Sequence, residues 1–294
     1  MNTRPLRTLA RPYIVTSGKG FRLSKRPTKG AHHEEHAKKF LKKGVKVLSG
    51  LQEKLYAQDR WGVLLIFQAM DAAGKDSAIE HVMSGVDPTG CQVYSFKNPS
   101  SEEIDHDFLW RTSKSLPERG RIGIFNRSYY EETLVVRVHP EILAHQRVPK
   151  ALVTPRIWRE RFEDINAFER YFARQGFVIL KFFLHVSRKE QRNRFLARLD
   201  RPEKNWKFAM GDLAERSCWR AYMSAYDDMI RHTATTHAPW VIVPADDKKF
   251  ARTVVAAAVI DAMTRLKLQF PVVDAKQRAD LRRARRLLER ESGR

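Results

Sequence analysis

Asp71, Gly74 and Lys75 stand in a turn between an apolar segment and a helical one, an arrangement typical of phosphate binding. The apolar segment is Val63–Phe67, and the turn, Ala69–Gly74, is rich in small residues. Successive backbone N–H groups in such a turn, with the positive end of the following helix, converge on phosphate oxygens. The lysine adds a mobile positive charge, so the first hypothesis is phosphoryl chemistry.

The turn departs from the standard Walker A pattern at two positions. Ala69 stands where the pattern asks for glycine, and Asp76 follows the lysine where it asks for serine or threonine. Asp71 lies inside the turn, where a carboxylate repels phosphate unless a cation lies between them, so it is predicted to bind Mg²⁺. The alternative is an ordinary strand-to-helix turn with an aspartate N-cap. The strand and helix on either side favour the phosphate site.

Asn126 and Arg127 follow a second apolar strand, 121–126, at the position where a Walker B aspartate normally stands. An asparagine keeps an oxygen ligand for a metal but carries no charge, so Asp71 has to contribute more to metal binding. Arg127 presents a planar pair of donors to phosphate. The alternative is a helix N-cap followed by a surface arginine.

Arg137 lies inside the apolar run 134–138, where an unpaired charge is costly. Glu131 is one candidate partner. Bound phosphate is the other, and the sequence favours neither.

A dense group of cations occupies residues 187–212, which we predict to form a helical lid. Arg194 and Arg198 are four residues apart and therefore share a helix face, while Pro202 and Gly211 are suited to hinges. A closing lid shields reacting phosphates from water. Solvated surface charge is the ordinary alternative. The cations are Arg188, Arg192, Arg194, Arg198, Arg201, Lys204 and Lys207.

Strands and helices alternate along the chain, which predicts an α/β fold with a parallel sheet and helices on both faces. In such a sheet ligands bind at the carboxyl ends of the strands. We expect the carboxyl ends of the first and third strands to lie next to each other. The expected strands are 61–68, 92–96, 121–126, 177–185 and 240–244, and the expected helices are 33–57, 75–84, 101–116, 155–175, 187–199, 213–235 and 250–267.

The 294 residues carry a net charge of +21, which predicts a polyanionic partner. We expect a basic N-terminal arm at 1–32, a single domain at 33–271 that begins with a helical extension, and a basic helical tail at 272–294. The helical appendages at both ends are suited to a symmetric interface, so we expect a homo-oligomer.

The longest apolar runs are far shorter than the ~20 residues of a spanning helix, so no membrane segment is expected. Cys91 and Cys218 are isolated, which fits neither a disulfide framework nor a metal site and favours a reducing, cytoplasmic location.

Three segments together resemble the polyphosphate kinase 2 family of bacterial phosphotransferases. They are AMDAAGKDSAI, IGIFNRSYYEETLVVRVH and RFLARLDRPEKNWKF, and the resemblance extends from about Tyr13 to Pro271. It implies a P-loop kinase-like fold that uses Mg²⁺ and inorganic polyphosphate to phosphorylate nucleotides. The expected partners are therefore polyphosphate and AMP, ADP or ATP.

Residue by residue, the resemblance implies that Asp71 and Lys75 act at the transferred phosphoryl group and that Asn126 and Arg127 face them. Asn126, with the YYEE and VVRVH runs, is similar to the subgroup that phosphorylates both AMP and ADP, whereas Ala69 departs from the family's usual glycine. Further residues expected at the substrates are Ala72, Ala73, Gly74, Asp76, Ser77, Glu131, Arg137, Arg194, Arg198 and Lys207.

Two other functions use the same features. An ATP-dependent small-molecule kinase has the same loop, and a nucleic-acid-binding protein has the same basic surface. The second function requires aromatic side chains placed among the cations for base stacking, whereas the aromatic residues here mostly lie in apolar strands or at helical core spacing. We therefore expect no nucleic acid as a physiological ligand.

Overall fold

The computed structural model describes residues 8–30 and 34–291, which form an α/β fold around a six-stranded sheet. The strand order is β1-β6-β5-β2-β4-β3. All neighbouring strands pair in parallel except β1, which runs antiparallel to β6. The strands are β1 (Ile14–Val15), β2 (Gly62–Gln68), β3 (Cys91–Ser95), β4 (Ile122–Asn126), β5 (Phe177–His185) and β6 (Trp240–Pro244).

Strand β2 lies in the interior of the sheet, between β5 and β4, and all seven of its residues are buried. It pairs with β5 from Gly62 opposite Phe177 to Gln68 opposite Phe183, and with β4 on its other side. Continuous burial, rather than alternation, is what strands covered on both faces require. The predicted parallel sheet is therefore confirmed, with the five expected strands.

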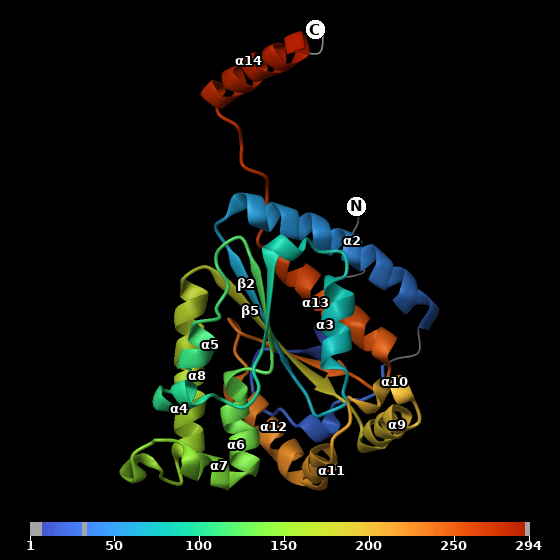
Figure 1. The fold of residues 1–294 in the computed structure, drawn as a ribbon, viewed down its shortest axis with the longest axis vertical. Coiled ribbons are helices and arrows are strands. Elements are labelled where there is room, and N and C mark those ends of the chain that lie inside the picture. The colour runs from blue at the N-terminus through green and yellow to red at the C-terminus, as the bar shows by residue number, and fades with distance from the viewer. Residues whose placement is uncertain (1–7, 31–33, 292–294) are drawn as a thin grey trace.

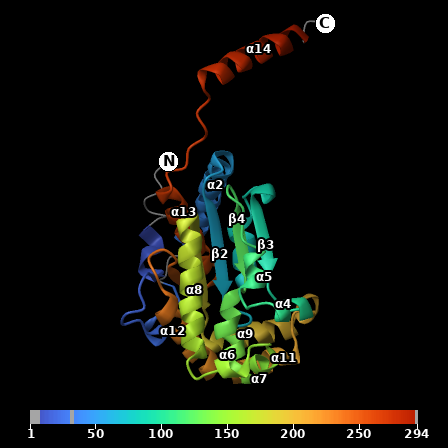
Figure 2. The same ribbon diagram turned by 90° about the vertical axis from the view of Figure 1, so that its left-hand side faces the viewer.

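Helices flank both faces of the sheet (Figure 1). On one side α13 (Lys248–Arg265) packs against α2 (Glu34–Gln58) and α3 (Lys75–Met83). On the other side α8 (Ile157–Arg174) packs on β5 and against α12 (Trp219–Thr233), as Figure 2 also shows. The remaining α-helices are α4 (Ser101–Asp105), α5 (Trp110–Ser113), α6 (Val135–Val138), α7 (Pro140–His145), α9 (Arg188–Leu199), α10 (Pro202–Asn205), α11 (Met210–Ser217) and α14 (Ala275–Glu291). Short 3-10 helices are η1 (Arg11–Tyr13), η2 (Leu23–Lys25), η3 (Pro88–Gly90), η4 (Tyr129–Thr133) and η5 (Lys150–Leu152).

Two expected helices are interrupted in the structure. The segment 101–116 forms α4 and α5, because the Asp107 side chain accepts a hydrogen bond from the N–H of Leu109 at 2.9 Å and turns the chain between them. The segment 213–235 forms the end of α11 and all of α12, which meet at Cys218. The helical spacing of the hydrophobic residues continues across both interruptions, so this spacing alone does not predict them.

The described part of the basic N-terminal arm, 8–30, packs on the domain. It supplies β1, and Val15, Phe21 and Leu23 are buried in the hydrophobic core. The N–H of Leu23 donates to Asp227 Oδ1 at 2.5 Å, which ties the arm to α12.

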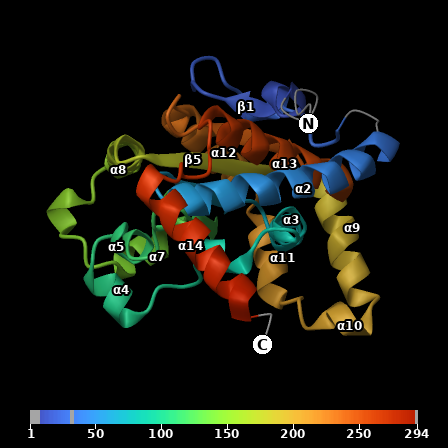
Figure 3. The ribbon, with the colours of Figure 1, turned by 90° about the horizontal axis from the view of Figure 1, so that it is seen from above.

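At the other end, helix α14 is joined to α13 by an extended linker and stands away from the domain (Figures 1 and 2). Seen from above, α14 crosses over α2 (Figure 3). None of the helices within residues 8–30 and 34–291 is long and apolar enough to cross a membrane.

Candidate active site

The loop after β2 and the end of β4 are neighbours at the carboxyl edge of the sheet. Phe67 stands opposite Asn126 in the parallel register, and the N–H of Arg127 donates to the Phe67 carbonyl at 3.0 Å. The predicted meeting of the phosphate loop with the Asn126–Arg127 pair is therefore found.

The phosphate loop is a tight turn that leads directly into α3. The N–H of Ala73 donates to the Met70 carbonyl at 3.2 Å, and Ala72 and Gly74 both adopt positive φ, of 58° and 101°. Gly74 precedes the first residue of the helix, where glycine tolerates the left-handed conformation best. Lys75 begins the helix, and its Nζ donates to the Ala69 carbonyl at 3.0 Å. Free N–H groups at this helix start are oriented for an anion.

Charged groups of both signs meet beside this loop. Arg127 Nη2 lies 3.3 Å from Asp71 Oδ1, and Arg127 Nη1 lies 4.0 Å from Glu131 Oε2. Asn126 Nδ2 donates to Asp76 Oδ1 at 2.7 Å. Arg127 also has a positive φ of 64°, a strained conformation of the kind that concentrates at functional sites.

Burial and neighbouring charges shift the pKa values of this cluster. Burial lowers the pKa of Lys75, while Asp71 opposes the shift and Arg127 adds to it. Burial raises the pKa of Glu131 against the opposing influence of Arg127. For Arg127, burial lowers the pKa, but Glu131 and Asp71 outweigh it and the pKa is raised. The guanidinium therefore stays charged, whereas Lys75 loses its proton more readily than a free lysine.

Helix α9 contacts the phosphate loop through Arg194. All five N–H donors of Arg194 are used. Nη1 donates to the carbonyls of Ala72 (3.1 Å) and Ala73 (2.7 Å), Nη2 to those of Ala245 (2.6 Å) and Asp246 (3.2 Å), and Nε to Glu190 (2.8 Å). In this conformation Arg194 thus holds the loop and has no donor left for phosphate.

Gln191, one turn earlier on α9, completes this contact. Its Nε2 donates to the Asp71 carbonyl at 2.9 Å, and its Oε1 accepts from Arg216 Nη1 at 2.7 Å. Together Gln191 and Arg194 bind three successive loop carbonyls. Because those carbonyls point toward α9, the loop's geometry depends on the helix that begins the predicted lid.

Arg137 has a partner that the sequence did not indicate. Its Nη1 donates to Asp228 Oδ2 on α12 at 2.6 Å, so the candidate pairing with Glu131 is wrong and Glu131 lies beside Arg127 instead. A contact between Arg137 and phosphate stays a prediction.

The other predicted residues lie at the edges of the site. Ser77 Oγ accepts from Arg252 Nη2 of α13 at 2.5 Å. Arg198 Nη1 donates to the Lys207 carbonyl at 3.0 Å and lies 3.4 Å from Asp212 Oδ2. The Lys207 side chain lies over the Trp206 ring, 4.8 Å from its centroid, and both residues are exposed. Lys207 is therefore accessible to a ligand, whereas Arg198 is half-buried and Arg194 is buried.

A buried polar network next to η4 was not predicted from the sequence. Tyr130 Oη and Tyr129 Oη both donate to Glu169 Oε1, at 2.7 and 2.9 Å, and Lys181 Nζ donates to Glu169 Oε2 at 2.7 Å. Lys181 and Glu169 are fully buried. Lysine within the apolar strand 177–185 and glutamate within α8 were visible signals of a buried pair, since neither charge is tolerated alone in a core.

The oxygen atoms near the loop fit the predicted Mg²⁺. Within residues 8–30 and 34–291, no group of three His, Cys, Asp or Glu side chains is arranged around a single metal position. Mg²⁺ is usually bound through one or two carboxylates together with water and substrate phosphates, so a dense protein cage is not required. The Asp71 and Asp76 carboxylates and the Asn126 amide oxygen supply suitable hard ligands.

Comparison with known proteins agrees with this geometry. Residues 31–271 match the family model described as Polyphosphate kinase 2. The chain is 50% identical over 280 residues to an ADP-polyphosphate phosphotransferase from Rhodopseudomonas palustris, covering 94% of this chain and 97% of that protein. It is 45% identical over 224 residues to an AMP/ADP-polyphosphate phosphotransferase from Meiothermus ruber, covering 76% and 80%.

A solved structure is also similar over most of the chain. The crystal structure of Polyphosphate Kinase 2 from Arthrobacter aurescens TC1 superimposes with a TM-score of 0.84 at 39% identity, covering 93% of this chain and 96% of that one. The matched family region contains the phosphate loop, the Asn126–Arg127 pair and α9. The chain belongs to the polyphosphate kinase 2 family.

Proposed function

We propose that this protein transfers the terminal phosphoryl group of inorganic polyphosphate to AMP or ADP. The observation that carries the proposal is the phosphate loop with Lys75 and Arg127 beside it, in a chain 50% identical to an ADP-polyphosphate phosphotransferase. The proposal for AMP as a second acceptor is supported by Asn126 and by the similarity to the Meiothermus ruber enzyme.

In the proposed reaction, a terminal phosphate oxygen of the acceptor nucleotide attacks the end phosphorus of polyphosphate in line. A new P–O bond forms, the outermost P–O–P bridge breaks, and the shortened polyphosphate leaves with the bridging oxygen. One phosphoanhydride replaces another, so the free-energy change is small and the reaction runs in both directions. No covalent bond to a side chain is required.

The protein's part is to position the reactants and to stabilise charge. The loop N–H groups bind phosphate oxygens, and Lys75 exchanges the Ala69 carbonyl for the transferring phosphoryl group. Arg127 remains charged and approaches the same group from β4. Asp71 and Asn126, with Asp76 close by, would hold Mg²⁺, which when bound neutralises part of the phosphate charge.

We further propose that the segment 187–212 acts as a lid. Lys207, which is exposed, and Arg198, which is half-buried, bring positive charge to the polyphosphate. Closure of the lid excludes water, the competing acceptor. Arg194 is assigned a positioning role, because its contacts hold the loop. The proposal places the reaction in the cytoplasm, without nucleic acid as a ligand and with the protein acting as a homo-oligomer.

A donor-swap assay tests the proposed function. The purified full-length protein is given Mg²⁺, ADP and polyphosphate, and ATP formation is followed in the absence of any other nucleoside triphosphate. A parallel reaction contains AMP. Rapid ATP formation supports the proposal, whereas phosphorylation that occurs only when ATP is the donor would establish the ATP-dependent kinase instead.

A further inference from the structure

Helix α14 presents a surface that the proposed reaction does not use. Each of its residues, Ala275–Glu291, is exposed. Figures 1 and 2 show the helix beyond the edge of the sheet opposite to α9 and α11, far from the phosphate loop. Most helices in proteins owe their stability to the packing of an apolar face, and α14 buries none of its residues against the domain.

Apolar residues and most of the cations of α14 lie on different faces of the helix. Leu281, Ala284 and Leu288 recur with the spacing of a coiled-coil seam, in which the two leucines take the a positions and the alanine the d position between them. Leu281 and Leu288 are 60% and 62% exposed. Five cations, Lys276, Arg282, Arg283, Arg286 and Arg290, fall at the outer b, c and f positions, away from the seam.

Charges of opposite sign flank the seam. In the same register Asp280 takes a g position and Arg285 the e position of the next heptad. When two such helices pair in parallel, each g residue contacts the e residue of the following heptad on its partner, so Asp280 of one copy meets Arg285 of the other, twice by symmetry. An antiparallel pair places e beside e and brings the arginines together instead.

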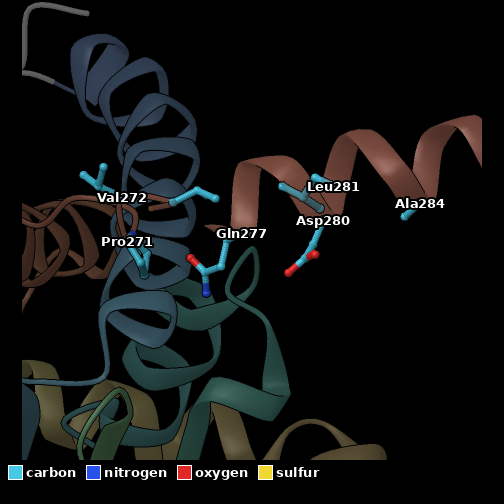
Figure 4. A pocket seen from close by; sticks show the side chains of 7 residues that line it. Pro271, Val272, Gln277, Asp280, Leu281 and Ala284 are labelled. Carbon is cyan, nitrogen blue, oxygen red and sulfur yellow. The ribbon is translucent and has the colours of Figure 1, made fainter. Parts of the chain in front are cut away.

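Hollows run along this side of α14. One, of about 450 Å³, lies between the helix and the linker residues Pro271–Val273, and a second, of about 380 Å³, continues toward Glu289. Leu281 and Ala284 line both hollows. Figure 4 shows Leu281 and Asp280 on the helix next to the linker. The three seam residues therefore border open space rather than the rest of the domain.

We propose that α14 pairs in parallel with α14 of a second copy of this chain. A lipid surface is the principal rival, since basic amphipathic helices also bind anionic membranes. Asp280 decides against it: a membrane-bound helix favours lysine or arginine beside its apolar face, and an anionic surface repels a carboxylate there.

Cysteine cross-linking tests the pairing directly. Symmetry-related d positions of a parallel pair are close enough for a disulfide, so Ala284→Cys is expected to convert most of the full-length protein into a covalent dimer under mild oxidation. Arg283→Cys, one residue away at an outer position, is the matched control and is expected to stay at the wild-type background. Equal cross-linking of the two variants, or none of Ala284→Cys, would overturn the proposal.

Charge exchange tests the register. In the Ala284→Cys background, Asp280→Arg and Arg285→Asp are each expected to slow cross-linking at least tenfold, because each places like charges together. Mixing these two variants restores both ion pairs and is expected to recover the rate as a mixed dimer. Arg282→Asp makes the same charge change on the outer face and is expected to have little effect.

Loss of the mixed-dimer recovery contradicts the parallel register. Binding of the monomeric chain to anionic lipid vesicles, with no cross-linking at residue 284, identifies a membrane as the partner and rejects the pairing.

Discussion

Arg194 Nη1 lies 2.7 Å from the carbonyl oxygen of Ala73, in the turn that presents Lys75. This contact joins the helix that begins the predicted lid to the loop that we propose binds phosphate. Arg194 is buried, and its remaining donors bind Ala72, Ala245, Asp246 and Glu190. The position of the loop therefore depends on a cation that in this conformation has no donor free for the substrate.

Replacing Arg194 with lysine is expected to lower kcat roughly 10- to 100-fold, because a displacement of about 1 Å in a reacting group has effects of that size. A lysine cannot bind the four carbonyls at once, so the loop shifts. The KM for polyphosphate is expected to change little, which separates a positioning role from a phosphate-binding one. Arg192→Lys, on the exposed side of α9, serves as the control. A raised KM with unchanged kcat would assign Arg194 to substrate binding.

Removing the ammonium from the buried network is expected to destabilise the protein by about 3–5 kcal/mol, because Lys181→Met leaves the Glu169 carboxylate buried without its counter-ion. Denaturant unfolding at neutral pH measures the loss. The double variant Lys181→Met/Glu169→Gln removes the unpaired charge as well and is expected to recover part of the stability. A double variant less stable than the single one argues against an uncompensated carboxylate as the cause.

The stability of the protein is expected to fall as the pH drops from 6.5 towards 4, because of His185. Burial lowers the pKa of His185 from 6.5 to about 4. The unfolded chain therefore binds a proton that the folded chain does not, and the free energy of unfolding declines through this window by about 3 kcal/mol before levelling off. Urea unfolding at several pH values checks the slope. His185→Gln is expected to flatten it, and an unchanged slope in that variant would place the titrating group elsewhere.

The sheet was predictable because its signals are local. Each parallel strand is a continuous apolar run, and Gly74 and Lys75 identify the loop without any tertiary information. The neighbourhood of Asn126 and the loop also followed, since parallel strands end at the same edge. Strand β1 was not predictable, because two paired residues leave no alternation to detect.

The sequence shows where the cationic residues stand in the chain, but the groups that pair with them were less predictable. Arg137 is paired by Asp228, 91 residues later in the chain, and Arg194 by loop carbonyls about 120 residues earlier. Helical spacing placed Arg194 and Arg198 on the same face of α9, but it does not say what lies opposite. Every residue has a backbone carbonyl, so the sequence does not indicate which carbonyls accept hydrogen bonds from Arg194. These contacts are found only in the structure.

We propose that Lys75 and Asp71 act directly on the phosphoryl group transferred from polyphosphate. ATP formation from ADP and polyphosphate, measured with purified Lys75→Ala and Asp71→Asn, tests it most directly. Each variant is expected to lose roughly 10²- to 10³-fold in kcat, the usual effect of removing one group that stabilises transition-state charge. Lys46→Ala, an exposed lysine on α2, is expected to retain wild-type activity. Wild-type turnover in both site variants would show that neither side chain acts on the transferred group.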